Sequence, residues 1–280
     1  MNLGRVLVNG SETRDIDYSD RGFQYGDGVF ETIAVVNHTP LFLKQHLDRL
    51  YLGCSTLSIP FSDLSALQQD INSLLHTQTT AVLKIQITRG VGGRGYRSSD
   101  VCLPSRVVSV HAMPDYPETL AKTGIKLCYC KTQLAINPRL AMIKHMNRLE
   151  QILARQEWHS ADIHEGLMCD SEGFVVEGTM TNLFWVKRGQ LYTPEIDRCG
   201  VAGVMRSVIL KLADDYGEVV HIRRCTVDDI EAADELFVTN SVIGLWPVCA
   251  LGELGYRPGS VTAKVKQWLD RSVSQALNQS

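Results

Sequence analysis

The sequence predicts a protein of mixed α and β structure in two parts, and three observations support this. Residues 43–57 carry apolar side chains at helical spacing. Other runs, such as 29–36 and 107–112, are rich in the residues that strands favour. The segment 113–117, Met-Pro-Asp-Tyr-Pro, then breaks the periodicity. Because 280 residues suffice for one large domain or two of moderate size, we expect this break to be an interdomain linker.

The composition is that of an ordinary globular protein. Hydrophobic residues make up 44% of the chain and charged residues 21%, and the formal net charge is -3. This balance gives no sign of a nucleic-acid partner or of an anionic membrane partner. No apolar run reaches the ~18 residues of a membrane span, and residues 1–5 lack the apolar core of a signal peptide. We therefore expect a cytoplasmic protein.

The cysteines indicate neither a metal site nor a disulfide framework. The chain has 8 cysteines and 8 histidines, and none of the cysteines forms a Cys-x-x-Cys pair. The histidines show no paired spacing with the cysteines that would suggest zinc ligands. Cysteines spread this thinly through a chain of this size are typical of reduced, mostly buried small residues. We expect no bound metal.

In the first part, Asn9-Gly10 predicts a hairpin turn after a weakly alternating run. Helices are expected at 43–57 and 64–76, and strands at 29–36, 81–88 and 107–112. The second part opens with a strand at 125–130 and a helix at 149–159, with Leu149, Ile152 and Leu153 on one side. The remaining expected elements are short strands at 165–169, 174–177, 182–187, 190–193 and 235–238 and helices at about 204–216 and 261–277. The predicted division is residues 1–113, a linker of 114–120, and residues 121–280.

Lys144 is the centre of the segment 141–151, Ala-Met-Ile-Lys-His-Met-Asn-Arg-Leu-Glu-Gln. Buried surroundings push a lysine towards the neutral amine, which can attack a carbonyl, although most lone lysines are solvated. The segment closely resembles the catalytic-lysine segment of the fold-type IV pyridoxal-phosphate enzymes, and specifically that of their aminodeoxychorismate lyase branch. The resemblance implies that Lys144 bonds to pyridoxal 5'-phosphate and moves protons.

Two further segments resemble the same family. The first, Asp20-Arg-Gly-Phe-Gln-Tyr-Gly-Asp-Gly-Val-Phe-Glu-Thr32, would otherwise predict only a glycine hairpin before a strand. The resemblance places Phe30 and Thr32 in the wall of the cofactor pocket, with Phe30 facing substrate and Thr32 assisting proton transfer. The second, His46-Leu-Asp-Arg-Leu50, matches the segment whose arginine holds the cofactor phosphate. A guanidinium suits that task because its fork donates two parallel hydrogen bonds; without the resemblance Arg49 would be taken for a surface residue.

The glycine-rich segment Arg89-Gly-Val-Gly-Gly-Arg-Gly-Tyr-Arg97 is suited to binding an anion. It is no Walker loop, because it lacks the Gly-Lys-Ser/Thr ending, and a solvated hairpin tip is the alternative. The segment is similar to the lyase's version of this loop. In the related D-amino-acid transaminases the matching positions contact the substrate carboxylate across the dimer interface. Arg94 is therefore the leading expected substrate ligand, with Tyr96 and Arg106 as further candidates.

The last matches concern the cofactor ring and its phosphate. Glu177 ends an apolar run in a segment that resembles the one whose glutamate pairs with the pyridine nitrogen, where an anion keeps the ring an electron sink. A salt-bridged glutamate at a strand end is the alternative. Val204 and Met205 follow glycines at an expected helix start, which binds phosphate well. Together with Asn240 and Ser241, they match the family's phosphate contacts.

The resemblance covers nearly the whole chain. It implies an α+β fold of the D-amino-acid aminotransferase-like type, with the cofactor between an N-terminal α+β domain and a strand-rich C-terminal domain that carries the lysine. It also implies a homodimer that converts 4-amino-4-deoxychorismate into 4-aminobenzoate and pyruvate, with a functional link to aminodeoxychorismate synthase. The alternative is a D-amino-acid or branched-chain transaminase. Thr32 and Leu149 argue against the branched-chain enzymes, which usually have glycine and tyrosine there. A non-catalytic carrier of the cofactor would fit only if Lys144 were free of cofactor or the substrate loops were lost, and the sequence suggests neither.

Overall fold

The computed structural model describes residues 4–76, 78–99 and 101–278, and it divides into two compact units. The first unit holds the chain up to Pro114, the segment Ile143–Asn147 and the chain from Ala276 onwards. The second unit holds Asp115–Met142 and Arg148–Gln275. The chain therefore changes units at Pro114, close to the predicted linker. In contrast to the expected division, the segment around Lys144 belongs to the first unit.

The expected linker is a packed part of the second unit. Asp115 already belongs to that unit, and the Tyr116 ring lies edge-on against Trp246 with the centroids 4.9 Å apart. A short helix, α4 (Leu120–Thr123), follows at once. The prolines at 114 and 117 thus end the preceding strand without producing an unpacked connection.

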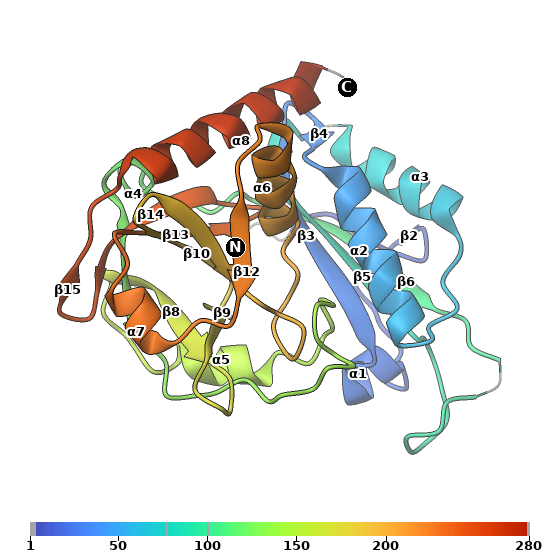
Figure 1. Cartoon of the computed structure of the whole chain (residues 1–280). Helices are drawn as coiled ribbons and strands as arrows, with labels where there is room; N and C mark the ends of the chain where they lie inside the picture. Colours follow the sequence, from blue (N-terminus) through green and yellow to red (C-terminus); the bar gives the residue numbers. More distant parts are fainter. Residues whose placement is uncertain (1–3, 77, 100, 279–280) are drawn as a thin grey trace. The chain divides into compact units, whose positions relative to one another are not determined.

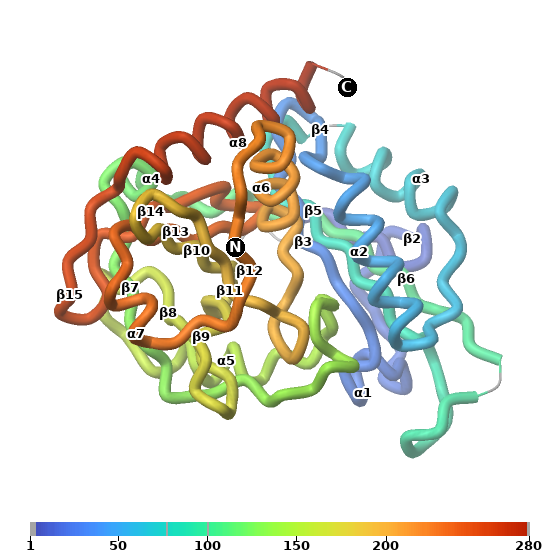
Figure 2. Tube along the Cα trace, in the orientation of Figure 1, coloured from blue at the N-terminus to red at the C-terminus, as the bar shows by residue number. Residues whose placement is uncertain are grey.

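Among the described residues of the first unit, six strands form an antiparallel sheet in the order β2-β1-β6-β5-β3-β4. Helices α2 and α3 both pack against this sheet, α2 against β3 and α3 against β6 (Figure 1). Residues 89–99 leave the end of β5 and run well beyond the strands (Figure 2). The elements are β1 (Val6–Val8), β2 (Ser11–Glu12), α1 (Arg21–Tyr25), β3 (Gly28–Val36), β4 (Thr39–Pro40), α2 (Leu43–Thr56), α3 (Leu64–Leu75), β5 (Thr80–Thr88) and β6 (Ser105–His111).

The two faces of this sheet differ in character because side chains alternate along a strand. Val29 and Ile33 of β3 pack into one apolar core with side chains of α2 and α3 such as Leu50 and Leu67. Phe30 and Thr32 point to the opposite face. Residues directly opposite each other on neighbouring strands share a face. The side chains of β5 and β6 that the register places opposite Phe30 and Thr32 therefore point to that face as well.

In the described part of the second unit, β10, β13, β14, β7, β8 and β9 follow one another, and β9 pairs back with β10, so these strands form a closed ring. Closing a sheet on itself removes exposed strand edges. The strands are β7 (Ile125–Tyr129), β8 (Ile163–Cys169), β9 (Val175–Gly178), β10 (Asn182–Lys187), β11 (Gln190–Pro194), β12 (Val220–Arg223), β13 (Glu235–Asn240), β14 (Gly244–Leu251) and β15 (Leu254–Gly255), and the further helices are α5 (Leu149–Arg155), α6 (Val204–Asp215), α7 (Val227–Glu231) and α8 (Ser260–Asn278).

The expected element types are mostly present, with one clear difference. The helix predicted at 149–159 ends at Arg155, and Leu149, Ile152 and Leu153 on it are at least half exposed. All eight cysteines are free thiols, and three of them are buried. No helix of the described residues is long and apolar enough to cross a membrane.

Candidate functional site

The segment around Lys144 runs along the start of β3 in the first unit. Phe30 N–H donates to the Lys144 carbonyl at 3.0 Å, and Met146 N–H donates to the Gly28 carbonyl at 2.9 Å. Gly28 permits this close approach, since a Cβ there would lie 2.7 Å from Met146 Sδ. These contacts bring the Lys144 Nζ to 4.5 Å from the centroid of the Phe30 ring. The structure thus groups Lys144 with Phe30, as expected for one wall of a site.

Thr32 and Lys84 lie on the same sheet face as Phe30. Thr32 follows Phe30 by two residues on β3, and Lys84 is its direct partner on β5. Lys84 Nζ lies 5.6 Å from the centroid of the Phe30 ring. Burial lowers the pKa of Lys84, and no carboxylate among the described residues pairs with it. Two lysines therefore flank one aromatic ring, which is an environment suited to an anionic ligand.

The sequence interpretation missed Lys84. The strand over 81–88 was predicted, so alternation alone would have placed Lys84 and Gln86 on one face. Alternation along one strand does not predict the register between β5 and β3, and this register places Lys84 opposite Thr32. Register between strands is set by tertiary packing and turn geometry and cannot be read from one strand.

Arg49 belongs to a buried network on the helix-packed side of the sheet. Its Nε and Nη2 donate to Glu31 Oε1 and Oε2 at 2.8 and 2.6 Å, and His46 Nδ1 lies 2.6 Å from Glu31 Oε2. Burial raises the pKa of Glu31, but Arg49 and His46 outweigh it and hold that pKa below its ordinary value. Burial also lowers the pKa of His46. One edge of the Arg49 guanidinium is thereby fixed by a carboxylate, and its role as a phosphate ligand stays a prediction.

Glu177 lies where the strand ring of the second unit closes. It is the β9 residue opposite Asn182 of β10, and it is only 4% exposed. Its Oε2 accepts from Val201 N–H at 2.8 Å and from Asn182 Nδ2 at 3.4 Å. Asn182 Nδ2 also donates to the Val201 carbonyl at 2.9 Å. These donors hold the carboxylate in one place.

The start of α6 lies next to this carboxylate network. Gly203 is the N-cap residue and supplies no side chain to the free N–H groups of the first turn, which includes Val204 and Met205. A Cβ at Gly203 would overlap Asn182 Oδ1, so the backbone approaches Asn182 as only glycine allows. Exposed N–H groups at a helix start are suited to binding an anion such as phosphate.

Asn240 shapes the turn after β13. Its Oδ1 accepts from Val242 N–H and Ile243 N–H at 2.8 and 2.9 Å, and its Nδ2 donates to the Met180 carbonyl at 3.2 Å. Ser241 is half-buried in the same turn. Oδ1 and one Nδ2 hydrogen of Asn240 therefore hold this turn by bonds to the protein's own backbone, and the second Nδ2 hydrogen is a further donor.

The three candidate substrate ligands differ in placement. Arg94 and Tyr96 are exposed on the glycine-rich loop, where Tyr96 is 91% exposed. Arg106, in contrast, lies opposite Ile87 of β5, which lies opposite Val29 of β3. This register places Arg106 on the sheet face away from Phe30. Arg106 is 8% exposed and binds Asp70 at 2.6 Å. Its charge is paired with Asp70 on the helix-packed side of the sheet, so it does not share a face with Phe30, and its role as a substrate ligand stays a prediction.

Comparisons with known proteins agree with this arrangement. The family model for class IV aminotransferases matches residues 28–251. The chain is 36% identical to the aminodeoxychorismate lyase of Vibrio harveyi over 87% of this chain and 90% of that protein. It is 28% identical to the D-alanine aminotransferase of Bacillus licheniformis over 96% and 97% of the two chains. The crystal structure of 4-amino-4-deoxychorismate lyase from Pseudomonas aeruginosa superimposes with a TM-score of 0.91 at 43% identity, covering 95% of this chain and 98% of that one. The chain therefore belongs to the class IV aminotransferase family and has its mixed α and β fold.

Proposed function

We propose that this protein is a pyridoxal-phosphate-dependent lyase that splits 4-amino-4-deoxychorismate into 4-aminobenzoate and pyruvate, a step in folate synthesis. The observation that carries the proposal is the 43% identity over 95% of the chain to a protein solved as 4-amino-4-deoxychorismate lyase. The D-alanine aminotransferase of Bacillus licheniformis is more distant, at 28% identity. A transaminase of the same fold remains the second candidate.

The side chains present fit pyridoxal 5'-phosphate. Lys144, beside the Phe30 ring, would bond to the cofactor, and Glu177, held by two donors, would face its ring nitrogen. Its phosphate would be bound by Arg49 and by the turn and helix start that hold Val204, Met205, Asn240 and Ser241. When bound, the cofactor supplies an electron sink for the carbon that loses a proton. A carboxylate such as Glu177 suits that role, since an anion beside the ring nitrogen keeps that nitrogen protonated.

Lys144 would carry the protons. Its Nζ, as the neutral amine, would take the proton from the substrate ring carbon beside the nitrogen. Loss of the enolpyruvyl group then makes the ring aromatic, and Nζ would return a proton to the departing enolate to give pyruvate. Thr32 lies on the same sheet face as Phe30, two residues along β3, and its hydroxyl would assist this second transfer.

The substrate carries two carboxylates, which require cations. Arg94 and Tyr96 remain our candidates for one of them, because both are exposed on the glycine-rich loop. Lys84 is the candidate that the structure adds. Its ammonium is half-buried beside Phe30, and a carboxylate would compensate for the desolvation that lowers its pKa.

We further propose that the protein acts in the cytoplasm as a homodimer and receives its substrate from aminodeoxychorismate synthase. The exposed apolar side chains Leu149, Ile152 and Leu153 on α5 support a protein–protein contact, because solvent-exposed leucines that lie together commonly mark an interface.

The choice between lyase and transaminase is tested by comparing substrates. The purified protein is assayed with aminodeoxychorismate, and separately with D-alanine or L-leucine plus 2-oxoglutarate. We expect kcat/KM to be far higher for aminodeoxychorismate. If either amino acid is the better substrate by kcat/KM, the transaminase replaces the lyase as the function.

A further inference from the structure

A buried guanidinium lies beneath the exposed glycine-rich loop. Arg21, the first residue of α1, is only 4% exposed, although arginine is mostly a surface residue. Its Nη1 donates to the Gly95 carbonyl at 2.9 Å and to the Gly93 carbonyl at 3.4 Å, and its Nη2 donates to the Tyr96 carbonyl at 3.2 Å. Its Nε pairs with Asp27 at 3.0 Å. One side chain thus binds the loop backbone on both sides of Arg94.

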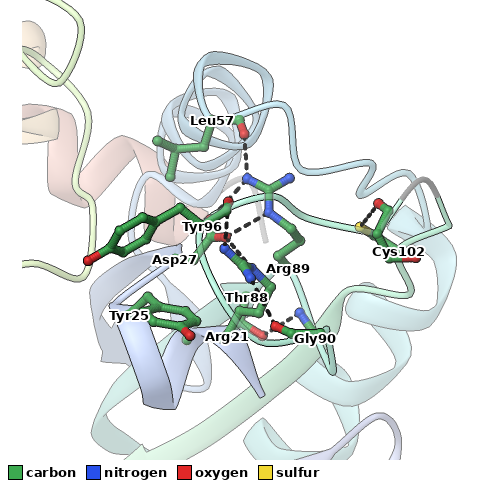
Figure 3. Close-up of polar contacts among 12 residues, drawn as sticks. Arg21, Tyr25, Asp27, Leu57, Thr88, Arg89, Gly90, Tyr96 and Cys102 are labelled. Atoms are coloured by element: carbon green, nitrogen blue, oxygen red, sulfur yellow. Dashed lines mark hydrogen bonds and ion pairs between the residues drawn. The ribbon is translucent and has the colours of Figure 1, made fainter. Parts of the chain in front are cut away.

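Tyr25, from the same short helix, contacts the same loop. Its hydroxyl accepts from Gly95 N–H at 3.2 Å, and its ring lies edge-on to Tyr96 with the centroids 5.9 Å apart. The Arg21 guanidinium lies 4.8 Å above the Tyr25 ring, so the two side chains support each other. Figure 3 shows both of them beneath the loop, with Tyr96 beside Tyr25. The loop therefore has a defined conformation within a single chain.

Arg89 binds the same carboxylate as Arg21 but holds a different part of the unit. Its Nε and Nη2 pair with Asp27 Oδ2 and Oδ1 at 2.7 and 2.9 Å. Its remaining donors bind the carbonyls of Leu57 and Ser58 at the end of α2, at 2.7 and 2.8 Å. In Figure 3 the two guanidiniums meet at Asp27. Arg89 thus fixes α2, whereas Arg21 fixes the glycine-rich loop.

Gly92 is the loop residue that packs directly on Arg21. A Cβ at this position would lie 2.6 Å from Arg21 Cδ and 2.9 Å from Cγ, so any larger residue would displace the arginine. Its neighbour Gly93 would meet nothing within 4 Å. Neither glycine has a positive φ, so alanine is compatible with the backbone at both positions. Alanine at position 92 therefore disturbs the contact with Arg21, whereas alanine at position 93 removes a glycine from the loop without disturbing that contact.

We propose that Arg21 is a positioning residue for substrate binding: it shapes the glycine-rich loop so that Arg94 and Tyr96 are presented before substrate arrives. The inference deepens the proposed function and rests on it. A flexible glycine-rich loop would have to be ordered at each binding event, and a loop that is ordered in advance avoids that entropy cost. The guanidinium is suited to this task because its planar fork reaches several carbonyls at once, which a lysine ammonium cannot do in the same geometry.

Two variants disturb this contact and two matched variants do not. Gly92→Ala displaces Arg21 without removing a hydrogen-bonding group, and Arg21→Lys keeps the charge beside Asp27 but loses the fork. Gly93→Ala and Arg223→Lys make the same chemical changes away from the loop–Arg21 contact. Arg223 donates two hydrogen bonds to Asp229 in the second unit. For each protein, kcat and KM are measured with aminodeoxychorismate, and the absorbance of the bound cofactor is recorded. Amide hydrogen exchange of residues 91–97 is measured without substrate.

We expect Gly92→Ala and Arg21→Lys to raise KM by about 10- to 100-fold, the scale of a small misplacement of a binding group, with kcat and the cofactor spectrum unchanged. Exchange in residues 91–97 should become faster in these two variants and stay at the wild-type rate in Gly93→Ala and Arg223→Lys. Wild-type KM and exchange in Gly92→Ala would overturn the proposal, as would an equal rise of KM in all four variants. A wild-type protein without lyase activity would instead refute the proposed function, and the exchange rates would still decide whether Arg21 orders the loop.

Discussion

Lys84 and Lys144 lie against the same aromatic ring, and only Lys144 could be recognised in the sequence. Lys144 belongs to a distinctive run of residues, whereas Lys84 lies in an ordinary strand pattern. Arg106, expected to bind substrate, pairs with Asp70, which the sequence did not indicate. A sequence shows that a cation is present on a strand. Which face of the sheet it occupies depends on pairing with distant strands.

The proposed role of Lys84 gives a first prediction. Lys84→Met keeps the length of the side chain and removes the ammonium that would face a substrate carboxylate. A charge-assisted contact is worth roughly 1.5–3 kcal/mol, or about 10- to 150-fold in an equilibrium constant. We expect KM for aminodeoxychorismate to rise by about that factor in steady-state kinetics, with the cofactor absorbance unchanged. Lys44→Met, at a lysine whose side chain is 83% exposed, is the control. Equal KM values for Lys84→Met and the wild-type protein would remove Lys84 from the site.

The elements with a strong local signal were predicted well. The expected helices at 43–57 and 64–76 correspond to α2 (Leu43–Thr56) and α3 (Leu64–Leu75), and the strand expected at 81–88 corresponds to β5. Helical spacing of apolar residues specifies such elements without reference to distant parts of the chain. Helix α1 was missed, since it has only five residues; Asp20, which accepts from Gly22 N–H at its start, was the available signal.

The helix expected at 149–159 was predicted too long for a tertiary reason. Glu157 lies beyond its end and accepts from the backbone N–H of Thr132 at 2.7 Å. A helix that continued through Glu157 would have to give up this contact with a loop 25 residues earlier in the chain. Such tertiary contacts override local helix propensity, and the sequence around Glu157 does not predict them.

The start of α6 gives a prediction for an element. In Gly203→Ala the new methyl group would collide with Asn182 Oδ1 and thereby disturb the donor that holds Glu177. We expect the dissociation constant of pyridoxal phosphate to rise by about tenfold or more, the scale of one charge-assisted hydrogen bond. Titration of the cofactor-free protein measures this. Gly255→Ala is the matched control, because a Cβ at Gly255 meets nothing within 4 Å. Tight binding by Gly203→Ala would show that Asn182 does not support the cofactor site.

On the scale of the whole molecule, the segment Ile143–Asn147 belongs to the first unit although the residues on both sides of it belong to the second. Its backbone bonds to Gly28 and Phe30 explain this assignment, because they join it to the start of β3. The sequence indicated an unusual segment around Lys144 and a break near residue 114. It could not indicate that the chain re-enters the first unit for so few residues, since that depends on backbone pairing with Gly28 and Phe30, far away in sequence.

The buried network of the first unit predicts how stability depends on pH. In the unfolded chain His46 binds a proton once the pH falls below its ordinary pKa of 6.5. In the folded chain burial lowers the pKa of His46, so the proton binds only at a lower pH. The pKa of Glu31 is also lowered from its ordinary value of 4.5 in the folded chain, because the effects of Arg49 and His46 outweigh that of burial. In both windows the unfolded state binds more protons, so the free energy of unfolding falls as the pH falls.

Urea unfolding between about pH 7.5 and about pH 5 measures this dependence, which for one proton reaches up to about 1.4 kcal/mol per pH unit. His46→Gln removes the titrating ring and keeps a donor for Glu31. We expect it to flatten the fall in unfolding free energy between pH 6.5 and 5, by up to about that slope. An unchanged pH dependence in His46→Gln would show that His46 is protonated equally in the folded and unfolded states.

The most direct test of the central claim is the stoichiometry of a reaction without any 2-oxo acid. A lyase needs no amino-group acceptor, whereas a transaminase stops after a single turnover when none is supplied. The purified protein, loaded with pyridoxal phosphate, is incubated with 4-amino-4-deoxychorismate, and pyruvate and 4-aminobenzoate are measured over time. We expect a lyase to form equal amounts of both products over many turnovers, and Lys144→Ala to form none. Product formation that stops after one turnover, or that requires a 2-oxo acid, would contradict the lyase function.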